Sequence, residues 1–220
     1  MEIVSNGLQP VGCVIMASGQ ATRFGSNKLL TDFRGKPLIY KALEITNTSL
    51  IAARVVVTRS PELADYCRGQ GVEVLLHDLP GRNDTVRLGL EALLDDCPGL
   101  AGCMFLPGDQ PLLRRASVEA LVWSFLLNPA LQKETERLIF RLGYQGPDDP
   151  FPLLGSPVLF GRAHFPALCA LPEGKGGHYL VDQHPECVKP VCTPNREELL
   201  DADTPQELET LLTYPSAASS

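Results

Sequence analysis

Two basic residues lie in a glycine-bearing loop that directly follows the first apolar run of the chain. The segment VIMASGQATRFGSNKLL, residues 14–30, leaves this run at Ala17 and then carries Arg23 and Lys28. Backbone N–H groups of such a turn can surround a phosphate, and arginine and lysine add charge-assisted hydrogen bonds. The spacing matches neither a Walker A loop nor G-x-G-x-x-G. The segment therefore predicts either a phosphate-binding turn or a solvated surface loop, and alone it does not distinguish them.

Acidic side chains suited to a metal ion follow two later apolar segments. Asp109 comes directly after the run MFLPG, and Asp201 and Asp203 alternate in DADTPQEL. A carboxylate at the C-terminal end of a strand is well placed to hold Mg²⁺, and Asp201 or Asp203 would supply a second one. The alternatives are a turn aspartate at position 109 and simple capping by Thr204 of a helix that starts at Pro205.

A third polar segment, PGRNDTVRLGL at residues 80–90, precedes a helical pattern. Asn83, Asp84 and Thr85 have side chains that can hydrogen-bond a base or a ribose, and the start of a helix favours an anion. The alternative is that Asp84 or Thr85 only caps the helix.

The rest of the chain alternates short apolar runs with helical patterns. We expect strands at 11–17, 54–58, 72–76, 103–106, 138–142 and 158–160, and helices at 36–46, 61–70, 85–95, 117–127, 162–171 and 205–212. Continuous apolar strands that alternate with helices indicate a parallel sheet covered on both faces. The predicted fold class is α/β, a doubly wound, mostly parallel sheet of Rossmann-like type. Ligands of such folds bind at the carboxyl ends of the strands.

One region departs from this alternation. We expect residues 1–214 to form a single domain and residues 215–220 to form a flexible tail. Within the domain, residues 129–157 include a loop rich in glycine, proline and aspartate. This region is interpreted as a small elaboration on the side of a second substrate.

Composition excludes several classes of partner. The net charge of −7 argues against general binding to nucleic acid or to an anionic membrane. The seven cysteines are scattered without a C-x-x-C motif, which indicates reduced thiols, and the role of Cys187 and Cys192 stays open. No signal peptide is visible and no apolar run is long enough to cross a bilayer, so we expect a cytoplasmic protein.

Taken in order, the motifs resemble those of the MobA/MocA-like nucleotidyltransferases. The run MASGQATRFGSNKLL…GKPLI is similar to the family's first signature, GDQPLL to its metal-binding segment and DADTPQEL to its closing segment. GSPVLF and GKGG look like its late loops. The resemblance covers roughly residues 11–212, and RNDTVRLGL brings it closest to the molybdenum cofactor cytidylyltransferase branch.

The resemblance implies a role for each matching position. The residues that would contact the nucleotide are Ala17, Ser18, Gly19, Arg23, Lys28, Asn83 and Thr85. The catalytic residues would be Arg23, Lys28 and Asp109. The cofactor would be Mg²⁺, with Asp109 and Asp203 as its ligands. The residues that would face the acceptor are Gly155, Ser156, Lys175 and Gly176.

The implied reaction transfers CMP from CTP to the terminal phosphate of molybdenum-molybdopterin cofactor and releases pyrophosphate. A molybdenum hydroxylase would then receive the product. Two positions depart from the family pattern, because Ser18 replaces an alanine or glycine and Ser156 stands where relatives often have histidine. The GTP-using branch usually reads Ala-Gly-Gly, so Ala17-Ser18-Gly19 favours CTP over another nucleoside triphosphate. A sugar phosphate or other alcohol phosphate as acceptor stays open, as does a non-catalytic carrier of molybdenum cofactor.

Overall fold

A computed structural model describes residues 9–19, 27–128 and 137–215. Arg23, in the predicted phosphate loop, lies outside these ranges. Within the described parts of the chain, no helix is both long and apolar enough to span a membrane.

Seven strands form the main sheet, in the order β5-β4-β1-β6-β8-β7-β9. Their bounds are β1 Val11–Ala17, β4 Ala53–Thr58, β5 Glu73–Leu76, β6 Gly102–Pro107, β7 Ile139–Tyr144, β8 Leu153–Gly161 and β9 Val188–Cys192. Strands β5, β4, β1 and β6 are parallel, β8 is antiparallel to both β6 and β7, and β7 is parallel to β9. The predicted class, an α/β fold with a mostly parallel sheet, is confirmed.

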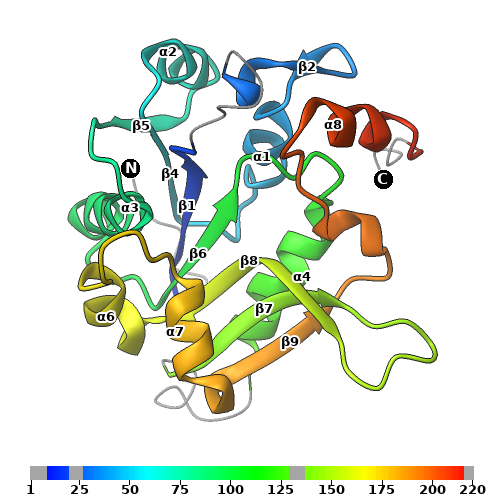
Figure 1. The fold of residues 1–220 in the computed structure, drawn as a ribbon. Helices are drawn as coiled ribbons and strands as arrows, with labels where there is room; N and C mark the ends of the chain where they lie inside the picture. Colours follow the sequence, from blue (N-terminus) through cyan, green and yellow to red (C-terminus); the bar gives the residue numbers. More distant parts are fainter. Residues whose placement is uncertain (1–8, 20–26, 129–136, 216–220) are drawn as a thin grey trace.

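Helices cover both faces of this sheet (Figure 1). One apolar layer packs against α1 Tyr40–Ile45, α2 Pro61–Gly69, α4 Arg115–Leu126 and α8 Pro205–Leu212. The other packs against α3 Arg82–Asp96, α6 Phe165–Cys169 and α7 His178–Gln183. Single turns of 3₁₀ helix occupy Lys28–Leu30, Arg162–His164, Pro185–Cys187 and Arg196–Leu199. Strand β1 is apolar along its length because its side chains enter both layers, Ile15 one and Val14 the other.

The order in which the chain adds strands to the sheet reverses between β1 and β6. From β1 the chain crosses to β4 and β5 on one side, and it then returns to place β6 on the other side of β1. In open α/β sheets, ligands bind outside the carboxyl ends of the strands at such a switch point. Ser18 follows β1 and Asp109 follows β6, so both lie at this edge.

The helix expected at 36–46 begins later than predicted. Residues Lys36–Pro37 form β3, which pairs with β2 Asp32–Phe33, and α1 starts only at Tyr40. Arg34 and Gly35 connect the two short strands with φ values of 57° and 83°. Two consecutive positive φ angles are typical of a tight hairpin turn, which is more often written Asn-Gly or Asp-Gly. The Arg-Gly pair gave no such signal in the sequence.

Other element boundaries also differ from the predicted ones. Helix α3 begins at Arg82 rather than at residue 85, so neither Asp84 nor Thr85 is its N-cap, and the Asp84 carboxylate accepts the Gly81 N–H at 3.1 Å. Strand β8 begins at Leu153, which places GSPVLF in a strand rather than in a loop. Strand β9 and helix α7 were not predicted, whereas α8 and its Thr204 cap are confirmed. Strands β7 and β8 also draw part of the expected elaboration into the main sheet, and its role beside a second substrate stays a prediction.

Candidate functional site

Three charged side chains from distant parts of the chain meet at the switch point. The Lys28 ammonium donates to Asp109 Oδ2 at 2.6 Å and to Asp203 Oδ1 at 2.9 Å. Lys28 and Asp109 are largely enclosed, with 13% and 19% of their side chains exposed, whereas Asp203 is 62% exposed. The predicted basic loop and the two predicted metal-ligating acids therefore share one ion-pair cluster, which we call the Lys28 cluster.

Local backbone contacts fix the position of Asp109. The N–H of Gly108 donates to the Met16 carbonyl at 3.0 Å, and the N–H of Ala202 donates to the Asp109 carbonyl at 3.0 Å. A Cβ at position 108 would lie 2.6 Å from Ile39 Cδ1, so any other residue here would require the Ile39 side chain to shift. The end of β1, the turn after β6 and the segment before α8 are thus held together by main-chain hydrogen bonds.

A buried carboxylate organises the chain that leads to Asp203. Glu198 is fully buried, and its carboxylate accepts the Arg114 N–H at 3.0 Å and the Asn195 Nδ2–H at 3.1 Å. The Thr193 hydroxyl donates to it as well. These bonds satisfy an acid that would otherwise be costly to bury. They also hold the turn Arg196–Leu199, from which the chain continues directly into the acids of the site.

The charges of the Lys28 cluster perturb one another. Desolvation alone would lower the pKa of Lys28, but the charges and hydrogen bonds of Asp109 and Asp203 outweigh it, and this pKa lies above its ordinary value. Desolvation, followed by the charges of Asp109 and Asp203, raises the pKa of Asp201 from 3.8 to about 6. Asp201 remains in contact with solvent although protein atoms crowd its carboxyl group. The described part of the site is therefore acidic, with the Lys28 ammonium group among the carboxylates.

The donor set fits a hard divalent cation. Within the described ranges no group of three or more His, Cys, Asp or Glu side chains is arranged to hold a metal ion by itself. Mg²⁺, however, is usually bound by one or two carboxylates together with waters and substrate phosphates, not by an all-protein cage. Asp109 and Asp203 already converge on one ammonium group, so the same two carboxylates suit a cation brought in with a triphosphate.

Ser18 is fixed by three residues, Val57, His77 and Arg59, that the sequence did not single out as part of the site. Its hydroxyl donates to the Val57 carbonyl at 3.0 Å and lies 2.9 Å from His77 Nε2. Because the hydroxyl proton is used on Val57, Nε2 must be the donor to Ser18. Arg59 donates twice to the Ser18 carbonyl, through Nε at 2.9 Å and Nη2 at 2.6 Å. Desolvation and then the Arg59 charge lower the pKa of His77, which favours this neutral form.

The other predicted nucleotide contacts lie on β1 and α3. Ala17 ends β1 and is buried, and Gly19 is exposed. The Asn83 Oδ1 atom accepts the N–H of Gly174 at 2.9 Å, which ties the start of α3 to the loop at 172–177. Thr85 is only 5% exposed. Contact of Asn83 and Thr85 with a base stays a prediction.

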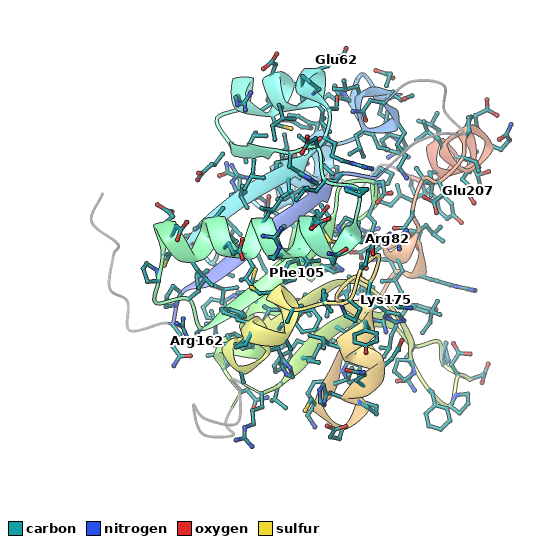
Figure 2. All side chains as sticks on the ribbon, turned by 60° about the vertical axis from the view of Figure 1, so that its left-hand side comes forward. Glu62, Arg82, Phe105, Arg162, Lys175 and Glu207 are labelled. Atoms are coloured by element: carbon teal, nitrogen blue, oxygen red, sulfur yellow. The ribbon has the colours of Figure 1, made fainter. Side chains whose placement is uncertain are left out.

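The predicted acceptor residues come from two segments. Lys175 is exposed and Gly176 is half-buried in the loop at 172–177, and Figure 2 shows Lys175 beside Arg82 at the start of α3. Gly155 and Ser156 belong to β8. A Cβ on Gly155 would lie 3.1 Å from Leu199, so this part of β8 packs closely on the segment that leads to the acidic residues.

Comparison with known proteins identifies the family of the chain. Residues 13–188 match the family model of the MobA-like NTP transferase domain. The chain belongs to this family. The curated relatives of the MobA-like chain include the 3-deoxy-manno-octulosonate cytidylyltransferase of Chlorobium phaeobacteroides, 33% identical over 51% of this chain and 44% of that protein. They also include the "Probable molybdenum cofactor guanylyltransferase" of Pyrococcus horikoshii, 27% identical over 50% of this chain and 54% of that protein. The chain spans about half the length of the curated relatives it matches.

Solved structures share the fold of the MobA-like chain at low sequence identity. Rv0371c from Mycobacterium tuberculosis has a TM-score of 0.75 and 21% identity, covering 94% of this chain and 100% of that one. A manganese complex of the same protein has a TM-score of 0.69 and 20% identity, covering 92% of this chain and 98% of that one. A CMP:2-keto-3-deoxy-manno-octonic acid synthetase complexed with CTP has a TM-score of 0.70 and 18% identity, covering 92% of this chain and 97% of that one. At these identities the likeness establishes the fold.

Proposed function

We propose that this MobA-like chain transfers CMP from CTP to the terminal phosphate of molybdenum-molybdopterin cofactor and releases pyrophosphate. The observation that carries the proposal is the Lys28 cluster, in which Lys28, Asp109 and Asp203 meet at the switch point of the sheet. A cation and two carboxylates at the ligand-binding edge suit a metal-associated triphosphate. They would have no evident use in a protein that only carries the finished cofactor.

Lys28 and Arg23 would neutralise the β- and γ-phosphates of CTP. An ammonium group has three N–H donors, and Lys28 spends two of them on Asp109 and Asp203. The third has no acceptor among the described residues and could reach a phosphate oxygen. Because its pKa is raised, Lys28 stays protonated throughout the neutral range and keeps the charge that this role requires.

Asp109 and Asp203 would hold Mg²⁺. When bound, the ion would supply Lewis-acid stabilisation of the charge that develops on the phosphates. One of the solved structures that share this fold is a manganese complex, which supports a divalent ion in this fold.

The acceptor phosphate would need no general base. A phosphate monoester has a second pKa of about 6, so its oxygen is already an anion at neutral pH. This oxygen would attack the α-phosphorus of CTP in line, forming a new P–O bond while the bond to the β-phosphate breaks and its electron pair leaves with pyrophosphate. The contribution of the protein is to position the two substrates and to offset their charge repulsion.

The choice of CTP rests on Ala17-Ser18-Gly19 at the end of β1. The name of the Chlorobium relative supports a cytidine nucleotide, whereas that of the Pyrococcus relative refers to guanylyl transfer. The base is therefore tested directly, by comparing CTP, GTP and ATP at equal concentration with Mg²⁺ and molybdenum-molybdopterin. We expect pyrophosphate release with CTP and a product whose mass equals cofactor plus CMP minus water.

Two substitutions test the roles of the site. Lys28→Ala and Asp109→Ala are each expected to lower turnover by about two to three orders of magnitude, because each removes a charge aimed at the transferring phosphates. Lys189→Ala, on the exposed face of β9, is the control and should keep normal turnover. Circular dichroism checks that each variant is folded. Normal turnover of Asp109→Ala would exclude a metal-binding role for this carboxylate.

The second candidate is nucleotidyl transfer to a different acceptor. Several curated relatives are named 3-deoxy-manno-octulosonate cytidylyltransferase, which favours a sugar-derived acceptor for the same nucleotide site. The same assay with 3-deoxy-manno-octulosonate and with sugar phosphates decides between them. Binding of molybdenum-molybdopterin without turnover of any nucleotide would instead support a carrier that delivers the cofactor to a molybdenum hydroxylase.

A further inference from the structure

Arg141, on β7, is a half-buried arginine that forms no ion pair with an acidic side chain in the described part of the chain. Its Nε donates to the Gly155 carbonyl at 2.8 Å and its Nη2 to the Leu154 carbonyl at 3.3 Å. None of the ion pairs between described residues includes Arg141, and desolvation lowers its pKa although the more distant charge of Asp182 opposes this shift. Partial burial of an unpaired cation is unfavourable, so its presence here needs a reason.

Arg54 shows what a purely structural arginine looks like in the same chain. It is also half-buried, and desolvation lowers its pKa as well. Its N–H groups, however, go to three acceptors at the C-terminal end of α1, namely the Leu43 carbonyl, Thr46 Oγ1 and Asn47 Oδ1. Arg54 therefore satisfies groups that a helix end leaves without partners. Arg141 uses two of its five N–H donors on β8, and its Nη1 group bonds to no described residue.

The surroundings of Arg141 include the segments that the sequence predicts to face the acceptor. In the β7–β8 pair Arg141 lies opposite Val158, and Phe160, two residues along β8, shares that face of the sheet. Ser156 lies where the register of the pair shifts, next to Gly155, whose carbonyl accepts the Arg141 Nε–H. The loop at 172–177 covers this face, because a Cβ on Gly177 would lie 3.1 Å from the Phe160 ring. The Ser156 hydroxyl forms no hydrogen bond with a described residue.

Two contacts connect this face to the nucleotide side. The loop at 172–177 binds Asn83 at the start of α3 through the Gly174 N–H. Gly155, whose carbonyl receives the Arg141 Nε–H, packs on Leu199, just before the acidic segment that carries Asp203. Arg141 is thus held by β8, the strand that pairs with β6, and Asp109 of the Lys28 cluster follows β6.

We propose that Arg141 and the Ser156 hydroxyl form a subsite for an oxyanion of the acceptor. Arginine suits this task because its planar N–H groups can bind two oxygens of a phosphate or a carboxylate at once. The inference rests on the proposed function, since it assigns the acceptor's anionic group a place on this face. The proposal assigns the subsite to an oxyanion, and the test distinguishes a phosphate group from a carboxylate group.

The direct test follows the Nε–H signal of Arg141 by ¹H–¹⁵N NMR in the wild-type protein. The signal is assigned by through-bond experiments, and the nucleotide site is first saturated with α,β-methylene-CTP and Mg²⁺ so that added anions do not enter it. Orthophosphate and, separately, acetate are then titrated. We expect a saturable shift of the Arg141 signal with at least one anion, while the Arg54 signal stays in place. An unmoved Arg141 signal, or equal shifts of both, would overturn the proposal.

Variants give a second readout. Arg141→Gln is expected to weaken binding of the effective anion at least ten-fold, Arg141→Lys to weaken it less, and the matched control Arg54→Gln to leave it unchanged. With an acceptor that turns over, Arg141→Gln should raise the acceptor KM at least ten-fold while the KM for CTP stays within two-fold. An unchanged acceptor KM would refute the subsite and leave the proposed function standing. If an anion binds at Arg141 but the protein releases no pyrophosphate from any nucleotide, the proposed function fails and the subsite stands.

Discussion

Asp201 is expected to destabilise the folded protein at neutral pH, so Asp201→Asn should stabilise it. Desolvation and the charges of Asp109 and Asp203 raise its pKa from 3.8 to about 6. For a fully enclosed group this difference would correspond to about 3 kcal/mol. Because Asp201 remains in contact with solvent, screening reduces the expected gain to about 1 kcal/mol. Asparagine has nearly the same shape and carries no charge, so it removes the repulsion without opening a cavity.

The pH dependence follows from the direction of the shift. Between about pH 4 and pH 6 the folded protein holds the Asp201 proton more tightly than the unfolded chain does, so this group's contribution to stability falls as pH rises through that window. Above about pH 6 its full destabilising effect is present. The advantage of Asp201→Asn over wild type should therefore be near zero at pH 4 and reach about 1 kcal/mol at pH 7.5.

Urea unfolding at these two pH values, with EDTA present, measures the difference in free energy of unfolding. Asp148→Asn, in the exposed turn between β7 and β8, is the control and should change stability little at either pH. An Asp201→Asn protein that is no more stable than wild type at pH 7.5, or equally stabilised at both pH values, would refute the electrostatic reasoning.

Three further substitutions test how the site is built, each by urea unfolding monitored by circular dichroism. Gly108→Ala should destabilise the protein by about 1–3 kcal/mol, because the new Cβ would lie 2.6 Å from Ile39 Cδ1; an unchanged midpoint would show that Ile39 yields freely. Glu198→Ala should lower the free energy of unfolding by about 3 kcal/mol, because it leaves without an acceptor the donors that now bond to the buried carboxylate. A loss of stability below about 0.5 kcal/mol would contradict that role. Thr204→Ala should cost about 1 kcal/mol through loss of the N-cap of α8, whereas Thr204→Ser should keep most of that stability.

Local sequence patterns predicted the elements that local chemistry determines. The apolar run of β1 is buried on both faces of the sheet and therefore stands out in the sequence, and the Thr204-Pro205 start of α8 follows helix-capping rules. Strand β9 could not be found this way, because VKPVC contains a proline and two half-buried residues and becomes a strand only by pairing with β7. The start of β8 is decided in the same manner by β7, across an irregular register.

The residues of the site likewise fall into those that a sequence motif indicates and those that only long-range contacts reveal. Lys28, Asp109 and Asp203 stand in recognisable segments, so the sequence suggested them, and the sheet order then explains why they meet. His77, Arg59 and Arg141 carry no motif. They stand out only through contacts with Ser18 or Gly155 that join different strands of the sheet, and no spacing along the chain reveals these contacts.

The most direct test of the central claim is calorimetric titration of CTP into the protein with and without Mg²⁺. If Asp109 and Asp203 hold the ion that accompanies the triphosphate and Lys28 neutralises its phosphates, CTP should bind more tightly with Mg²⁺ than with EDTA. Asp109→Asn should then remove most of that Mg²⁺-dependent gain, by about ten-fold or more in Kd. Equal CTP affinity in wild type and Asp109→Asn, with Mg²⁺ present, would contradict the account.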